Sequence, residues 1–310
     1  MKKILLISLL LSLTLYARDV VDNVGECKIN WSEGVIICQG ESAEGQNPYA
    51  AKVSAKVIAQ RNLLEVVKGV QIESEVTIAD GMLSSDIISS RVQGVIRGLQ
   101  TLSNKYNKKT KSSIATVKLQ MGKDLLAALL SDPNQLSWNE KVNQLWNSFS
   151  FITSAHADTY MPNEKETIKK ILKDLRTQGN KDGAKYLENI LSSIDKNNFS
   201  GILIDISGVS DFKKAMIVKL VDENGKEVYP AKLVDKRTLM KRNTSVGYMF
   251  GIEDARKNKR VFSTPLEIKA SGVYKNKKSN IVLTKKQLNM LKILNSNILR
   301  EAKIILVLGE

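Results

Sequence analysis

Two cysteines, Cys27 and Cys38, enclose a segment that predicts a tight β-hairpin. The ten residues between them supply two short strands around a turn centred on Ser32-Glu33. In that register the cysteines lie opposite each other, close enough for a disulfide. A shift of one residue would turn them to opposite faces and leave two free thiols. We therefore expect a Cys27–Cys38 disulfide, with two reduced cysteines as the alternative.

The first 17 residues indicate the oxidising compartment that a disulfide needs. Two lysines precede an apolar stretch from Ile4 to Leu15, and Leu15-Tyr16-Ala17 forms a small-residue cleavage site. This order is typical of a secretory signal peptide, and its apolar part is short for a membrane span. We expect residues 1–17 to be removed, so that the mature chain begins near Arg18 outside the cytoplasm. An uncleaved N-terminal anchor is the alternative, and a lipid anchor is not expected because no cysteine follows the apolar run.

The net charge narrows the range of partners. The 310 residues carry a formal charge of +15, and the two lysines of the signal leave about +13 on the mature chain. In the cytoplasm this excess would point first to nucleic acid. In an exported protein it favours anionic lipid head groups, lipopolysaccharide or an acidic protein surface, so we expect no nucleic-acid partner. Hydrophobic residues make up 43% of the chain, and no later apolar run approaches about 18 residues, which favours two globular domains without a membrane helix.

Basic residues gather in three predicted loops, over 105–111, 256–260 and 275–278. Solvated loop charge is one explanation of these clusters. Contact with a polyanion is the other, because exposed cations attract anionic partners. The candidate polyanion contacts are Lys105, Lys108, Lys109, Lys111, Lys257, Lys259 and Arg260.

Residues 18–131 show the pattern of a small α+β domain with a mostly antiparallel sheet. After the cysteine hairpin, Pro48 suits the first turn of a helix and Gly69 its end. The residues expected on the apolar face of this helix are Val53, Val57, Leu64 and Val67. The elements expected next are a strand over 70–78, a helix over 82–92, strands over 93–102 and 115–121, and a helix over 123–130.

Residues 132–198 predict a helical connector. Large apolar residues recur at helical spacing in its first part. They either pack on their own domain or contact a neighbouring subunit or the membrane surface, where aromatic residues are favoured. The candidate partner-interface residues are Trp138, Val142, Leu145, Trp146 and Phe149. Two charged helices are expected to follow, over 164–176 and 181–194.

Residues 199–310 predict a second α+β domain. Its expected strands cover 201–206, 215–221, 226–229, 266–270, 281–283 and 302–308. Thr284 and Gln287 form a capping box that begins a helix. Because the strand over 302–308 is mostly apolar, we place it centrally, beside 201–206. The predicted fold is thus two small α+β domains with mostly antiparallel sheets, joined by a helical segment.

The sequence lacks the motifs of common active sites. Its one histidine, His156, lies in a predicted linker, and the nearby Ser154 and Asp158 do not amount to a triad. There is no Gly-x-Ser-x-Gly elbow and no phosphate-binding glycine loop. Two cysteines and one distant histidine supply too few ligands for a metal. We expect no catalytic, cofactor-binding or metal-binding residue; a hydrolase built on an unrecognised carboxylate pair is the alternative.

Three segments in order resemble the FlgP-like flagellar basal-disk lipoprotein family. They are the hairpin from Cys27 to Ile36, the segment from Arg61 to Ile72, and the glycine-containing segment from Val92 to Gly98, which matches a strand of that family. The resemblance covers roughly residues 23–122. It implies a non-enzymatic scaffold in the periplasm, associated with the outer membrane and the flagellar motor.

The same resemblance implies a FlgP-like disk protein and other flagellar motor proteins as partners, in a homo- or hetero-oligomeric ring that supports motility. The lipid-bearing cysteine of that family is missing here. Attachment is therefore expected through partners, or through peripheral contact with the outer membrane. The alternative function is a basic envelope-binding module that contacts lipopolysaccharide or peptidoglycan.

Overall fold

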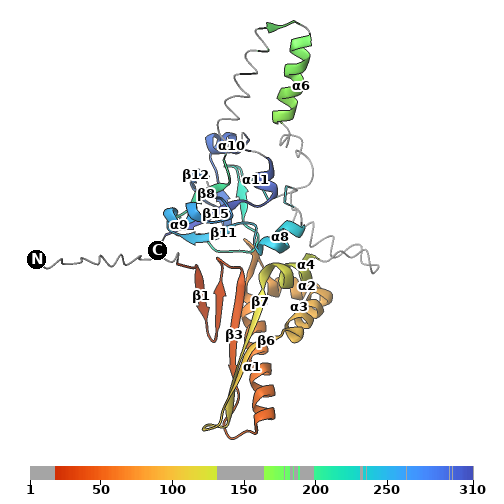
Figure 1. Ribbon diagram of the computed structural model, residues 1–310, viewed down its shortest axis with the longest axis vertical. Helices are drawn as coiled ribbons and strands as arrows, with labels where there is room; N and C mark the ends of the chain where they lie inside the picture. Colours follow the sequence, from red (N-terminus) through yellow and green to blue (C-terminus); the bar gives the residue numbers. More distant parts are fainter. Residues whose placement is uncertain are drawn as a thin grey trace, which may run out of the picture.

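A computed structural model describes residues 18–130, 164–177 and 199–309, with 179–181, 184 and 188 between them and without 231, 232, 235, 263, 293 and 295. The predicted signal peptide over 1–17 and residues 131–163 lie outside this description. Of the predicted connector, helix α6 (Glu164–Thr177) forms where a helix is expected. No helix within the described ranges is long and apolar enough to cross a membrane. The N-terminal part is an elongated arm, and the C-terminal part lies at one end of it (Figure 1).

The arm is built on a five-stranded antiparallel sheet with the order β1-β2-β3-β7-β6. Its strands are β1 (Val21–Val24), β2 (Cys27–Asn30), β3 (Val35–Glu41), β6 (Thr101–Asn107) and β7 (Ser112–Gln120). Along β7, the buried Ala115, Val117 and Leu119 alternate with more exposed residues, so one face of the sheet packs into the core. The predicted cysteine hairpin and the predicted strand over 115–121 are confirmed.

Helix α1 (Pro48–Gly69) packs on this sheet through small residues. Asn47 caps the helix, and Pro48 occupies its first turn as predicted. The buried residues of α1 are Ala51, Ala55, Ala59, Leu63 and Val67. A Cβ atom added to Gly40 on β3 would lie 2.1 Å from the backbone nitrogen of Ala59, so the strand and the helix are in direct backbone contact.

The predicted apolar face of α1 is only partly correct. Val67 is buried, but Val53 and Val57 are 47% and 56% exposed. The alanine stripe faces the sheet instead, because its short side chains allow the close approach at Gly40 that valines at the same place would prevent. The two valines therefore point to solvent.

Two strands predicted in the arm are wrong in whole or in part. Residues 70–78 form two short antiparallel strands, β4 (Gln71–Glu73) and β5 (Val76–Thr77). Helix α2 (Ile78–Ser84) then starts at a capping box made by Thr77 and Asp80. Residues 93–98 belong to helix α3 (Asp86–Gly98), because Ile88, Val92 and Ile96 bury one helical face. The segment from Val92 to Gly98, which was expected to match a glycine-containing strand, is therefore helical.

The chain leaves the arm through a turn of π-helix, η1 (Met121–Leu126), and α4 (Ala127–Leu130), where a helix was predicted. A Cβ atom on Gly122 would lie 2.0 Å from the carbonyl oxygen of Met240, in helix α8 (Lys236–Arg242). Asn243 accepts a hydrogen bond at Oδ1 from the backbone N–H of Gly122 (3.0 Å) and donates one from Nδ2 to the Glu33 carbonyl (2.9 Å). One side chain thus joins the cysteine hairpin, η1 and the end of α8.

The C-terminal part contains two four-stranded sheets, ordered β11-β15-β8-β12 and β10-β9-β14-β13. The first comprises β8 (Ile202–Asp205), β11 (Gly247–Phe250), β12 (Leu266–Lys269) and β15 (Ile304–Leu308), all parallel. The second comprises β9 (Lys219–Val221), β10 (Glu227–Tyr229), β13 (Gly272–Tyr274) and β14 (Lys277–Val282), with one parallel and two antiparallel pairs. The other helices described in this part are α9 (Ile252–Lys257), α10 (Lys285–Lys292) and α11 (Ser296–Arg300).

The predicted α+β layout in two parts is confirmed, and antiparallel pairing holds in the arm. The closing strand lies beside β8 in the centre of its sheet, as predicted. The parallel pairing of that sheet differs from the expectation. Its central strands β8 and β15 are buried nearly throughout, and continuous apolar runs of this kind are typical of parallel sheets covered on both faces.

The arm and the C-terminal part share one hydrophobic core, which runs from Val20 to Leu306. Strand β4 is bonded to the C-terminal part by two backbone hydrogen bonds, from Met216 N to Gln71 O (2.9 Å) and from Ile217 N to Ile72 O (2.7 Å). We call this contact between the two parts the seam. A shared core of this kind favours a fixed arrangement of the two parts.

Candidate interaction surfaces

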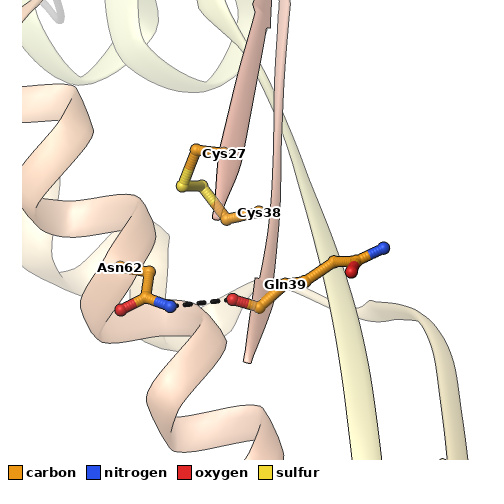
Figure 2. Close-up of a disulfide and its surroundings, with 4 residues drawn as sticks. All are labelled: Cys27, Cys38, Gln39 and Asn62. Atoms are coloured by element: carbon orange, nitrogen blue, oxygen red, sulfur yellow. Dashed lines mark hydrogen bonds between the residues drawn. A yellow bond between two sulfur atoms is a disulfide. The ribbon is translucent and has the colours of Figure 1, made fainter. Parts of the chain in front are cut away.

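A disulfide joins Cys27 and Cys38 within the arm, in the predicted register (Figure 2). The two residues are 1% and 0% exposed. Beside the bond, Asn62 of α1 donates a hydrogen bond from Nδ2 to the carbonyl oxygen of Gln39 (2.8 Å). The disulfide and this amide therefore tie the hairpin into the core of the arm. A buried disulfide of this kind is structural rather than reactive, because an attacking thiolate cannot reach it.

The first predicted basic cluster gathers at the end of the arm. Lys105 lies on β6, and Lys108, Lys109 and Lys111 occupy the turn to β7; all four are exposed. The turn is held against the chain that enters α1: Gln46 N donates to the Lys111 carbonyl (2.9 Å). The hairpin turn and the start of α1 thus meet at the end of the arm away from the C-terminal part (Figure 1). We call residues 41–57 and 105–111 the arm tip.

An exposed apolar stripe on α1 accompanies these lysines. Tyr49, Val53 and Val57 are 80%, 47% and 56% exposed and follow one another at four-residue spacing. This spacing places them on one solvent face of the helix, opposite the buried alanines. Sequence reasoning missed the stripe because it assigned Val53 and Val57 to the core.

The second predicted basic cluster lies in the C-terminal part, and the structure does not bring it to the first. Lys257 and Lys259 are exposed at the end of α9 and in the turn that follows. Arg260 turns inward instead, donating hydrogen bonds from Nε to the Ala302 carbonyl (2.6 Å) and from Nη2 to the Thr244 carbonyl (2.9 Å). Burial lowers the pKa of Arg260 to about 10, which leaves it charged at neutral pH. Its contacts make Arg260 a structural residue, not a contact offered to a polyanion.

The arm sheet also ends in two edge strands of different sequence, β1 and β6. Among the strands described, β6 pairs only with β7, and β1 pairs only with β2. Leu102 on β6 is 59% exposed and sits where the register shifts between Thr101 and Ser103. A shallow groove on the open face beside this edge is lined by Gln39, Glu41, Ser103, Lys105, Tyr106, Asn107, Ser112, Ile114 and Thr116. Edge strands with unpaired backbone groups are places where another chain can add.

A charged cluster that the sequence did not indicate crosses the seam. Lys219 Nζ on β9 lies 2.7 Å from Glu73 Oε2 on β4 and 3.5 Å from Glu227 Oε2 on β10. The three side chains are only 11–12% exposed. Burial raises the pKa of Glu73, while the nearby Lys219 opposes the rise. For Lys219, burial favours the neutral form, but the two carboxylates prevail and raise its pKa. The cluster therefore holds the two parts together through a buried cation.

The described part of the structure holds no candidate metal site. Across the part of the chain that it describes, no three histidine, cysteine, aspartate or glutamate side chains come together as a metal site. His156 lies outside the described residues. So does the whole predicted partner interface, which comprises Trp138, Val142, Leu145, Trp146 and Phe149.

Comparison with known families gives a match in the C-terminal part. Residues 201–310 match a family described as Treponema pallidum Tp0624, second domain. The match begins one residue before β8, which agrees with the two-part layout. No curated protein matches the chain. The match does not extend to the arm, so the expected resemblance of its three segments to the FlgP-like family stays a prediction.

Proposed function

We propose that this protein is a non-enzymatic structural component of the periplasmic flagellar basal disk beneath the outer membrane. In this role it assembles with a FlgP-like partner and other motor proteins, scaffolds the motor and supports motility. Three segments of the arm resemble the FlgP-like family in sequence, although the third, Val92 to Gly98, is helical and not the strand expected from that family. The size and order of the parts resemble those of FlgQ, the companion of FlgP. The expected export signal and the buried disulfide are consistent with a periplasmic location.

The observation that carries the proposal is the pair of unlike edges on the arm sheet. A closed ring is built from head-to-tail contacts, which require two different surfaces on each subunit. Strands β1 and β6 provide such surfaces at opposite edges of one sheet. The shared core across the seam supports the same role, because a scaffold must hold its surfaces in a fixed relation.

The edge assignment can be tested with one substitution and a matched control. Leu102→Lys places a charge on the β6 edge, whereas Leu83→Lys changes a leucine that is 87% exposed on α2. We expect Leu102→Lys to lower assembly of the purified protein with its FlgP-like partner, measured by light scattering, and Leu83→Lys to leave assembly unchanged. If both variants assemble as well as the unsubstituted protein does, β6 is not the contact.

The arm tip favours a second candidate function, a module that binds anionic envelope material. Four exposed lysines gather there on one hairpin. Cells that lack the protein distinguish the two candidates, because loss of a disk with loss of swimming is expected only for the scaffold.

A further inference from the structure

We infer that the arm tip docks onto an anionic lipid surface, with its lysines at the lipid phosphates and its apolar stripe in the head-group boundary. The inference specifies the ligand of the second candidate function and does not depend on ring formation. It rests on two features that the structure places side by side, the basic hairpin turn and the exposed stripe Tyr49, Val53 and Val57.

The charge of the arm tip is strongly positive. Its lysines are Lys52, Lys56, Lys105, Lys108, Lys109 and Lys111, and its acidic residues are Glu41 and Glu44, which gives 6 − 2 = +4. The first turn of α1 contains no acidic residue, and this end of a helix adds a partial positive charge of about half a unit. Lysines at a surface of anionic lipids are attracted strongly enough to hold a protein there.

The apolar stripe makes a lipid surface a better partner than a soluble polyanion. Tyr49 is 80% exposed in the first turn of α1, next to the basic hairpin turn, and Val53 follows on the same face. An exposed aromatic and aliphatic stripe bordered by lysines is the pattern of helices that lie in the membrane interface. A soluble polyanion would contact only the lysines and would leave these apolar side chains exposed to water.

The shape and charge of the chain argue against the other occupants. The stripe lies on the convex outer face of a helix, so it does not form a groove for a peptide. A second copy of the arm tip would bring two +4 surfaces together, and the chain as a whole carries +15. A lipid surface with anionic head groups complements both features, and the tip lies away from the C-terminal part, where it can reach a flat surface (Figure 1).

The charge contribution is tested by sedimentation of the exported chain with phosphatidylglycerol–phosphatidylcholine vesicles and with phosphatidylcholine alone. The tip-charge variant changes Lys108, Lys109 and Lys111 to Gln. Its control removes the same charge from exposed lysines of the C-terminal part, by changing Lys257, Lys259 and Lys286 to Gln. We expect the tip variant to bind the anionic vesicles on the order of a hundredfold more weakly and the control to change little. Equal losses in both variants, or none in the tip variant, would overturn the assignment.

The apolar contribution is tested with Tyr49→Ser combined with Val53→Ser, and with Leu83→Ser as the exposed control. We expect roughly tenfold weaker vesicle binding for the double variant and no change for the control. Unchanged melting temperatures confirm that the variants fold, since all three side chains are exposed. The lipid assignment is rejected if the double variant binds vesicles normally, because the lysines would then serve a soluble polyanion. A changed oligomeric mass in the double variant would also reject it, in favour of a second copy on the stripe.

Discussion

Lys219→Met removes the cation from the charged cluster at the seam, and we expect it to destabilise the protein by about 3–5 kcal/mol. Lys219 Nζ lies between two carboxylates, 2.7 Å from Glu73 Oε2 and 3.5 Å from Glu227 Oε2, and all three side chains are nearly buried. Methionine keeps most of the side-chain volume, so the loss comes from two nearly buried carboxylates that no longer share the Lys219 cation. For a chain of this size the melting temperature should fall by roughly 5–8 °C.

The loss should depend on pH in a defined direction. Burial raises the pKa of Glu73, so the folded protein keeps this proton at pH values where the unfolded chain has released it. This group therefore makes folding less favourable as the pH rises above the usual carboxyl range. Lys219 opposes that effect by lowering the pKa of Glu73. Without Lys219 this penalty grows. The free energy of unfolding of Lys219→Met should therefore be closer to that of the unsubstituted protein at acid pH than at neutral pH.

Urea unfolding, followed by circular dichroism at acid and at neutral pH, measures the loss of stability and its pH dependence. Lys68→Met is the matched control, because Lys68 pairs with Glu65 at 2.9 Å on the exposed surface of α1, where such a pair contributes less than about 1 kcal/mol. Adding Glu73→Gln to Lys219→Met should recover part of the loss at neutral pH. The reasoning is refuted if Lys219→Met is as stable as Lys68→Met, or if its loss is the same at both pH values.

Two further predictions concern the core of the arm. Replacing Cys27 and Cys38 by serine should lower the free energy of unfolding by about 3 kcal/mol, because the disulfide closes a loop with a sequence separation of 11; reductant should then have no further effect on the urea midpoint. Gly40→Ala should cost about 1–3 kcal/mol, since the new Cβ meets the backbone of Ala59, whereas Gly69→Ala has open space and should leave the melting temperature nearly unchanged.

Local signals in the sequence predicted several of the elements whose ends are set by nearby residues, although the capping box of Thr77 and Asp80 at the start of α2 was missed. The cysteine hairpin follows from its turn, α1 starts after Asn47 with Pro48 in its first turn, and Thr284 and Gln287 exchange the hydrogen bonds of a capping box (2.8 and 3.4 Å). These features depend on residues within a few positions of each other. They are therefore visible in the sequence before any packing is known.

Features that depend on distant partners were missed. Val53 and Val57 have the right spacing for a core face, but Gly40 on a separate strand selects the alanine face instead. Arg260 looked like free loop charge, yet carbonyl groups from distant segments hold its guanidinium. The cluster around Lys219 was equally invisible, because its carboxylates come from the arm and from a neighbouring strand. A pattern within one element does not show which neighbour that element will meet.

Cryo-electron tomography of flagellar motors in cells that lack this chain tests the proposed scaffold most directly. We expect loss of a ring or disk beneath the outer membrane together with impaired swimming, and recovery of both when the intact chain is restored. An unchanged disk with normal swimming in the deleted cells would contradict the scaffold role.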